Sequence, residues 1–139
     1  MSTVIYHNPD CGTSRNVLAI LQAAGEVTVV RYLEQGWTRA QLQELFAAAG
    51  LTPKTALRTS KSPAEALGLT GEDVTDEAIL AAMLQHPILV NRPIVVTPKG
   101  TRLCRPSETV LGLLDRLPTG PLYKEDGTLM VLASDPRAP

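Results

Sequence analysis

The side chain best suited to chemistry in this 139-residue chain is Cys11, which lies in residues 7–15 (HNPDCGTSR). β-Branched and aromatic residues at 3–6 predict a short strand before it, and apolar residues at helical spacing over 15–24 predict a helix after it. A thiol in a strand-to-helix turn lies beside unpaired backbone N–H groups and the positive end of the helix dipole. Both favour the thiolate, which is the nucleophilic form of cysteine.

The same turn can hold an anion, because the backbone N–H groups of Gly12, Thr13 and Ser14 are candidate oxyanion donors. Thr13 and Ser14 are also N-cap candidates, so the helix is expected to begin within two residues of them. His7 either tunes the thiol or simply ends the strand. Asp10 places a carboxylate beside the thiol, which opposes thiolate formation unless the side chain points to solvent.

Basic residues gather in two places. The window 92–105 holds four of them and no acid, and a smaller group lies near residue 60: Arg92, Lys99, Arg102 and Arg105, then Arg58 and Lys61. Guanidinium groups suit oxyanions because they donate two parallel hydrogen bonds. If the window folds as a hairpin beside the first strand, Arg92 and Arg105 can reach the thiol. Periodicity alone leaves solvated surface arginines equally open.

Composition and spacing exclude several classes of protein. The net charge of −1 and the pI of about 6.1 do not favour nucleic acid or a membrane surface, and the apolar runs are too short to span a bilayer. Two cysteines 93 positions apart make no disulfide framework, so we expect a reducing cytoplasm. Ser14 stands where a Cys-x-x-Cys pair would have its second cysteine, and Arg15 comes too early for a Cys-x5-Arg phosphatase loop.

The other histidine and cysteine are expected to be structural. His86 precedes a proline near a helix end, and Cys104 alternates with its neighbours in a strand pattern, so we expect it to pack in the core. Together with His7 and Cys11 these residues lack metal-site spacing, and no phosphate-loop motif occurs. We therefore expect no metal and no bound cofactor.

The remaining patterns predict alternating strands and helices, interrupted by a stretch of short helical turns. A strand is predicted over 27–32, and a capping box at Thr38–Gln41 predicts a helix that continues through Ala49. Short turns of helix at 53–57 and 63–67 follow, and then a helix that is capped by Thr75 or Asp76 and stops before Pro87. The last elements are two strands at 93–97 and 101–105, joined by a turn, and a helix after Pro106 whose inward residues are Val110, Leu111, Leu113 and Leu114.

This order predicts an α/β fold, namely a thioredoxin-like mixed β-sheet flanked by helices. We expect one domain over residues 1–139, with a helical insertion at about 51–89 and a C-terminal tail over 118–139 whose last residues, 134–139, fray. In such a fold Pro93 occupies the position of a cis-proline beside the active cysteine.

Two long motifs resemble the bacterial arsenate reductases of the ArsC family, which use glutathione and glutaredoxin. The first motif is residues 6–15, which contain YHNP and CGTSR, and the second is residues 85–108, which contain QHPILVNRPIVVTP and GTRLCRPSE. The similarity as a whole runs from about residue 3 to residue 114 and includes Ala56-Leu57-Arg58. The resemblance implies that Cys11 is the nucleophile, that His7 is the histidine near the thiol, and that Arg58, Arg92 and Arg105 bind the oxyanion.

The resemblance further implies reduction of arsenate to arsenite by one cysteine, with arsenate, glutathione and glutaredoxin as partners and no nucleotide. Two alternatives stay open. One is a regulator resembling Spx, which binds RNA polymerase and senses disulfide stress, although that class typically carries Cys-x-x-Cys where this chain has Ser14. The other is a glutathione-dependent thiol transferase, which would not need an oxyanion-binding trio of arginines.

Overall fold

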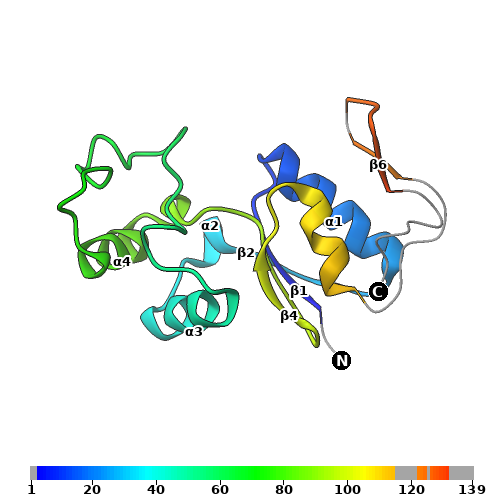
Figure 1. Cartoon of the computed structure of the whole chain (residues 1–139), viewed down its shortest axis with the longest axis horizontal. Helices are drawn as coiled ribbons and strands as arrows, with labels where there is room; N and C mark the ends of the chain where they lie inside the picture. Colours follow the sequence, from blue (N-terminus) through cyan, green and yellow to red (C-terminus); the bar gives the residue numbers. More distant parts are fainter. Residues whose placement is uncertain (1–2, 115–121, 125, 132–139) are drawn as a thin grey trace. The chain divides into compact units, whose positions relative to one another are not determined.

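The computed structural model describes residues 3–114, 122–124 and 126–131. The chain divides into two compact units, one of Met1–Arg31 with Arg92–Pro139 and the other of Tyr32–Asn91 (Figure 1). The first unit contains the Cys11 loop and the basic hairpin. The second contains the predicted insertion at 51–89 and also the two helices before it, within residues 32–50. The single-domain interpretation stays a prediction.

The first unit is built on a mixed four-stranded sheet with the order β2-β1-β3-β4. The strands are β1 (Val4–His7), β2 (Thr28–Arg31), β3 (Ile94–Thr97) and β4 (Gly100–Leu103). β1 is parallel to β2 and joined to it by α1 (Gly12–Ala24), while β3 is antiparallel to both β1 and β4. The predicted thioredoxin-like arrangement, a parallel βαβ unit followed by a hairpin, is confirmed.

The register brings the Cys11 loop to the start of the hairpin. Tyr6 on β1 pairs with Ile94 on β3, and Ile94 in turn pairs with Leu103 on β4. Because β1 and β3 are antiparallel, the loop that follows β1 and the residues that precede β3 meet at the same end of the sheet. The Arg92–Pro93 peptide bond there is cis, as predicted for this position.

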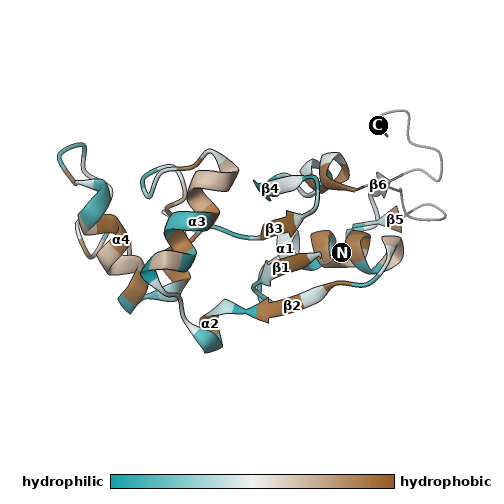
Figure 2. Ribbon diagram, turned by 90° about the horizontal axis from the view of Figure 1, so that it is seen from below, coloured by the Kyte–Doolittle hydropathy of each residue, from teal (hydrophilic) through white to brown (hydrophobic). Residues whose placement is uncertain are grey.

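α1 and the 3₁₀ helix η2 (Ser107–Leu113) pack on the sheet and against each other, and Figure 2 shows hydrophobic brown on β1, β3 and α1. The buried core they share comprises Ile5, Val17, Ile20, Leu21, Val95, Cys104, Val110, Leu111, Leu113 and Leu114. All four residues predicted to face inward from the last helix are buried. The segment is nevertheless a 3₁₀ helix, and Thr109, Val110 and Gly112 are all weak α-helix formers.

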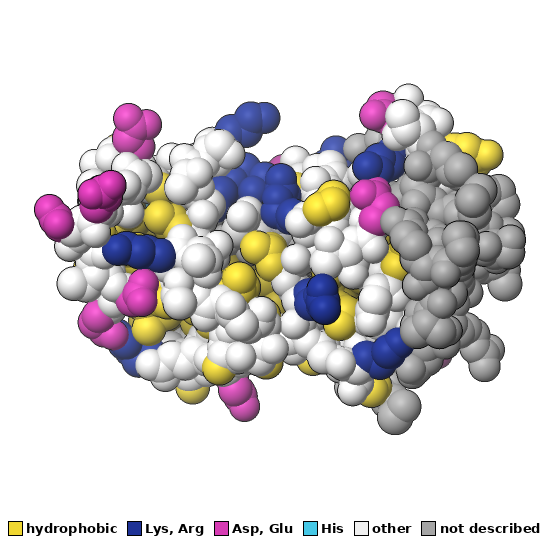
Figure 3. Space-filling view, viewed as in Figure 1, with side chains coloured by type: hydrophobic (Ala, Val, Ile, Leu, Met, Phe, Trp, Pro, Cys, Tyr) yellow, Lys and Arg dark blue, Asp and Glu magenta, His cyan; other side chains and the backbone are white. Residues whose placement is uncertain are grey.

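The second unit contains α2 (Tyr32–Gln35), α3 (Arg39–Ala49), α4 (Asp76–Gln85) and the 3₁₀ turn η1 (Pro87–Leu89). The capping box predicted for α3 is present: the Gln41 N–H donates to Thr38 Oγ1 at 3.1 Å, and the Gln41 side chain accepts from the Thr38 N–H. Thr75 is the N-cap of α4, and its Oγ1 accepts the Ala78 N–H at 3.1 Å. On the face shown in Figure 3, magenta acidic side chains gather toward the α4 end of this unit.

Three predictions for the second unit are wrong. Tyr32 does not end β2 but begins α2, where its ring stacks on Trp37 with centroids 5.0 Å apart. Residues 53–57 and 63–67 form hydrogen-bonded turns and no helix. Local side-chain bonds compete with helix there: the Thr52 N–H donates to Thr55 Oγ1 at 2.8 Å, and the Ala64 N–H donates to Ser62 Oγ at 3.3 Å.

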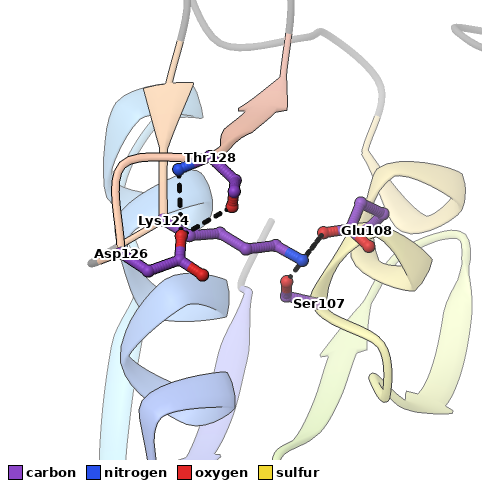
Figure 4. Close-up of polar contacts among 5 residues, drawn as sticks. All are labelled: Ser107, Glu108, Lys124, Asp126 and Thr128. Atoms are coloured by element: carbon purple, nitrogen blue, oxygen red, sulfur yellow. Dashed lines mark hydrogen bonds and ion pairs between the residues drawn. The ribbon is translucent and has the colours of Figure 1, made fainter.

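A short hairpin of β5 (Leu122–Tyr123) and β6 (Leu129–Val131) in the tail was not expected from the sequence. Its turn is held by Asp126, whose Oδ1 accepts the Thr128 N–H at 2.9 Å, and Lys124 Nζ pairs with Glu108 Oε1 on η2 at 2.9 Å (Figure 4). The ion pair connects the hairpin to η2 within the first unit. The predicted frayed end at 134–139 lies outside the described residues.

Candidate active site

Cys11 lies in a tight loop whose hydrogen bonds come from its own neighbours. Cys11 donates its backbone N–H to the Asn8 carbonyl at 3.1 Å, and Asn8 Oδ1 accepts the Asp10 N–H at 2.9 Å. Arg15 Nη1 donates to the Pro9 carbonyl at 2.7 Å and closes the loop from the other side. The backbone of residues 8–15 is therefore fixed around the thiol.

Cys11 is itself the N-cap of α1, so the predicted caps at Thr13 and Ser14 are wrong. The helix begins at Gly12, and the Ser14 hydroxyl has other partners. Ser14 Oγ lies 2.6 Å from His7 Nδ1 and accepts the Asn8 N–H at 3.1 Å. The earlier start places the thiol directly at the positive end of the helix, which is more favourable to thiolate than the arrangement expected from the sequence.

His7 and Ser14 form a buried polar pair behind the thiol, with exposed fractions of 5% and 0%. Burial, Arg31 and Arg15 lower the pKa of His7, so its imidazole is neutral at pH 7. A neutral His7 does not supply a positive charge to the thiol. Its contact is with Ser14, so any thiol tuning by His7 has to pass through that residue.

The electrostatic surroundings of Cys11 favour thiolate on balance. Burial raises the pKa of the thiol, while the Ser14 backbone N–H, Arg92 and Arg105 lower it and together leave it below its ordinary value. Arg105 Nη1 donates to Cys11 Sγ over 3.7 Å. Asp10 is exposed, so its carboxylate is solvated and opposes the thiolate little.

Arg105 is oriented by the chain segment before the cis-proline. Its Nη1 donates to the Arg92 carbonyl at 3.1 Å as well as to the sulfur. The Arg92 residue is 9% exposed. The structure thus brings Cys11, Arg92 and Arg105 together, as the hairpin argument predicted. Arg58 belongs to the second unit, where it is 7% exposed and its Nε donates to the Ser60 carbonyl at 3.0 Å, and its place in the oxyanion site stays a prediction.

Two residues that support the loop were missed by sequence reasoning. Asn8 is 2% exposed and accepts the Asp10 N–H, and Arg15 holds Pro9 through its guanidinium. An Asn-Pro-Asp run is a recognised turn signal, and it could have drawn attention to the Asn8 side chain. No sequence signal pointed to the bond made by Arg15.

The first prediction from this geometry concerns thiol acidity. The rate of Cys11 alkylation by iodoacetamide should rise with pH along a titration curve whose midpoint lies below the free-thiol value of about 8.5, because the lowered pKa makes the thiolate available earlier. The measurement is a pH series of second-order rates in the Cys104→Ser background. A rate that keeps climbing through pH 8.5 would contradict the prediction.

Cys104 is fully buried in the core, as predicted, and burial raises its pKa to about 12. It cannot act as a second thiolate near neutral pH. Cys104→Ser should therefore keep most of the activity, while the buried hydroxyl lowers the free energy of unfolding by about 1–3 kcal/mol. Turnover and urea unfolding measure the two effects. A trapped arsenic adduct in this variant would show that an internal disulfide route operates.

In the part of the chain that the structure describes, no group of three or more His, Cys, Asp or Glu side chains comes together as a metal site. Over the same residues, no helix has the length and apolar character needed to cross a membrane. Both cysteines are free thiols.

A mixed sheet of this order, with a cysteine at the N-terminus of its first helix and a cis-proline before β3, is the arrangement of the thioredoxin-like class of proteins. Residues 6–113, more than half of the chain, match the ArsC family. The chain belongs to the ArsC family.

Relatives of known name agree with this assignment. An arsenate reductase of Synechocystis sp. is 65% identical over 129 residues, covering 92% of each chain. The arsenate reductase of Escherichia coli K12 is 52% identical over 128 residues, covering 91% of each chain. The solved structure of an arsenate reductase from Vibrio cholerae superposes with a TM-score of 0.76 at 39% identity, over 82% of this chain and 98% of that one.

Proposed function

We propose that this protein reduces arsenate to arsenite, using Cys11 as the nucleophile. The observation that carries the proposal is the contact of Arg105 Nη1 with Cys11 Sγ over 3.7 Å, at the N-terminus of α1. A thiolate alone would repel arsenate. Here a guanidinium and helical N–H groups adjoin the sulfur, so the same place can activate the thiol and neutralise the anion.

The first step joins sulfur to arsenic. Arsenate binds to the backbone N–H groups of Gly12, Thr13 and Ser14 and to the arginines, with Arg58 proposed to complete the set. The Cys11 thiolate attacks arsenic(V), an As–S bond forms, and one arsenate oxygen leaves as water after protonation. Arsenic is still pentavalent in this adduct, so the reduction needs further electrons.

Two outside thiols supply the reduction. Glutathione forms a second As–S bond and displaces another oxygen as water. The glutaredoxin thiolate then attacks the glutathione sulfur, the As–S electron pair passes to arsenic, and a glutaredoxin–glutathione disulfide leaves. Water releases arsenite and restores Cys11. Two electrons pass from two thiols to arsenic, which balances the reaction.

The need for outside thiols is supported by the two cysteines of the chain. The other cysteine, Cys104, is 0% exposed with a pKa of about 12, and Ser14 occupies the place of a neighbouring resolving thiol. An adduct on Cys11 therefore has no partner in the chain to form an internal disulfide. A reducing compartment, which we propose to be the cytoplasm, keeps both thiols free.

The deciding experiment measures arsenite formed from arsenate by the purified protein with glutathione and glutaredoxin, and with each omitted in turn. We expect arsenite only when both are present. If arsenite forms with another dithiol alone, the protein is still an arsenate reductase, but glutathione and glutaredoxin are not its required reductants. Disulfide exchange without any arsenite would favour the thiol transferase, and redox-dependent binding to RNA polymerase without turnover would favour the regulator.

A further inference from the structure

Asn8 is hydrogen-bonded to three residues of the Cys11 loop and is almost wholly buried. Its side-chain Oδ1 accepts the Asp10 N–H at 2.9 Å, its carbonyl accepts the Cys11 N–H at 3.1 Å, and its own N–H donates to Ser14 Oγ at 3.1 Å. Asn8 is 2% exposed, whereas Pro9 and Asp10 beside it are exposed. The residue therefore lies inside the loop, and the turn that it closes faces solvent.

Two of the three bonds use the backbone of Asn8 and do not depend on its side chain. The third bond needs the carboxamide, and it closes the turn directly before Cys11. A backbone N–H can donate only to the oxygen of a carboxamide, so this bond also fixes which end of the side chain faces Asp10. The side chain therefore holds the Asp10 backbone at the point where the chain turns into α1.

The position of the sulfur depends on that turn, because Cys11 is the N-cap of α1. Its backbone is extended, with φ −102° and ψ 121°, as an N-cap requires. The residue before it has to lead the chain in this direction for the sulfur to adjoin the N–H groups of the first turn. The Ser14 N–H and Arg105 both act on the sulfur, so a small shift of the Cys11 backbone would weaken both contacts.

We propose that Asn8 is a positioning residue for the reaction, because its side chain holds the Cys11 sulfur at the N-terminus of α1. The inference rests on the proposed function only in taking Cys11 as the nucleophile, and it does not depend on arsenate as the substrate.

The chemistry of the loop favours a neutral acceptor at this position. A carboxylate would accept the same N–H. However, a negative charge on a residue that is 2% exposed would be screened little by water, and it would oppose both the thiolate and an incoming oxyanion. Asn8 provides the hydrogen bond without the charge.

The test measures alkylation of Cys11 by iodoacetamide in the Cys104→Ser background, so that no arsenate is needed. At about pH 6.5, Asn8→Ala should slow alkylation about threefold to tenfold, because a sulfur displaced from the helix end holds its proton more tightly. At about pH 9.5 both proteins are largely thiolate, and Asn8→Ala should react as fast as its parent or slightly faster. A loss of stability alone would not confine the difference to low pH.

Two further variants separate the hydrogen bond from charge. Asn8→Ser keeps a neutral acceptor for the same N–H and should recover part of the rate at low pH. Asn8→Asp keeps the acceptor but adds the charge, so at low pH it should react no faster than Asn8→Ala. Hydrogen exchange of the Asp10 amide reports on the bond itself, and it should be faster in Asn8→Ala than in Asn8→Ser and Asn8→Asp.

The tail hairpin offers a matched control. Asp126 Oδ1 accepts the N–H of Thr128, two residues further on, at the same distance of 2.9 Å. Asp126→Ala removes this bond outside the Cys11 loop and should leave the alkylation profile unchanged. The charged or titratable groups around the sulfur are the same in all of these variants, except for the carboxylate that Asn8→Asp adds: His7, Asp10, Arg92 and Arg105.

The outcomes separate this inference from the proposed function. The positioning role would be overturned by an unchanged profile in Asn8→Ala, by equal slowing at both pH values, or by Asn8→Ser reacting no faster than Asn8→Ala. A lower kcat/KM for arsenate with an unchanged profile would overturn it too, because Asn8 would then contact the substrate directly. If the profile shifts as expected but even the parent makes no arsenite, the proposed function fails and the positioning of Cys11 stands.

Discussion

Replacing Cys11 by serine is expected to abolish arsenate reduction while the fold stays intact. The serine hydroxyl is not ionised near neutral pH and cannot form the As–S bond with which the proposed mechanism begins. Serine has the same shape as cysteine and is slightly smaller, and the Cys11 loop is held by backbone bonds, so the structure should tolerate the change. Arsenite production should fall to the level of the protein-free control.

The measurement needs a check of folding and a matched variant. Circular dichroism and the urea midpoint of Cys11→Ser should stay close to those of the parent protein, and Cys104→Ser provides the second single-cysteine protein. Because each variant keeps one cysteine, comparing their arsenite production shows which thiol is needed for the reaction. Arsenite made by Cys11→Ser, or lost in Cys104→Ser with a normal fold, would exclude the mechanism.

Changing Arg105 to lysine should lower kcat/KM for arsenate by about tenfold to a thousandfold, or about 1.4–4 kcal/mol of transition-state binding. The structure gives a specific reason. One guanidinium nitrogen of Arg105 donates both to the Arg92 carbonyl at 3.1 Å and to Cys11 Sγ. Its remaining N–H groups can meet an oxyanion, whereas an ammonium keeps the charge and loses the fork. Arg92→Lys should fall in the same range.

Alkylation of Cys11 by neutral iodoacetamide should change much less in the same variants, because lysine preserves the positive charge that favours the thiolate. Arg102→Lys, two strands from β1 and exposed, is the matched control and should leave both rates unchanged. A parallel fall of both rates would assign the arginines to the thiol. If neither rate falls, the anion site lies elsewhere.

The sequence predicted those parts of the site that depend on residue type and chain order. The strand, turn and helix around Cys11 follow from local patterns, and the βαβ rule followed by a hairpin is enough to place Arg92 and Arg105 near the thiol. Burial of Cys104 followed from its place in a strand pattern. These inferences need no knowledge of which side chain bonds to which.

The parts that failed depend on competition between local hydrogen bonds. Ser14 is a good N-cap by composition, but its hydroxyl is bound to His7 and the Asn8 N–H, and so the helix begins earlier at Gly12. The turns at 53–57 carry a helix-like pattern that Thr52 and Thr55 override through side-chain bonds. Which partner a hydroxyl binds depends on the positions of other residues in the folded chain, and a sequence pattern does not give those positions.

The burial of Cys104 has a consequence for the step that limits the rate of the proposed reaction. In an arsenate reductase with its own resolving thiol, that thiol would release arsenic from the adduct at a rate set by the fold of the protein. In this chain Cys104 is buried in the core with 0% exposure, and residue 14 is a serine where a second cysteine would stand in a Cys-x-x-Cys pair. In the proposed mechanism, the arsenic adduct on Cys11 therefore waits for a thiol that diffuses in. When reduced thiols run short, the protein should accumulate as a loaded adduct, and arsenate clearance should follow the thiol supply of the cell instead of the amount of enzyme.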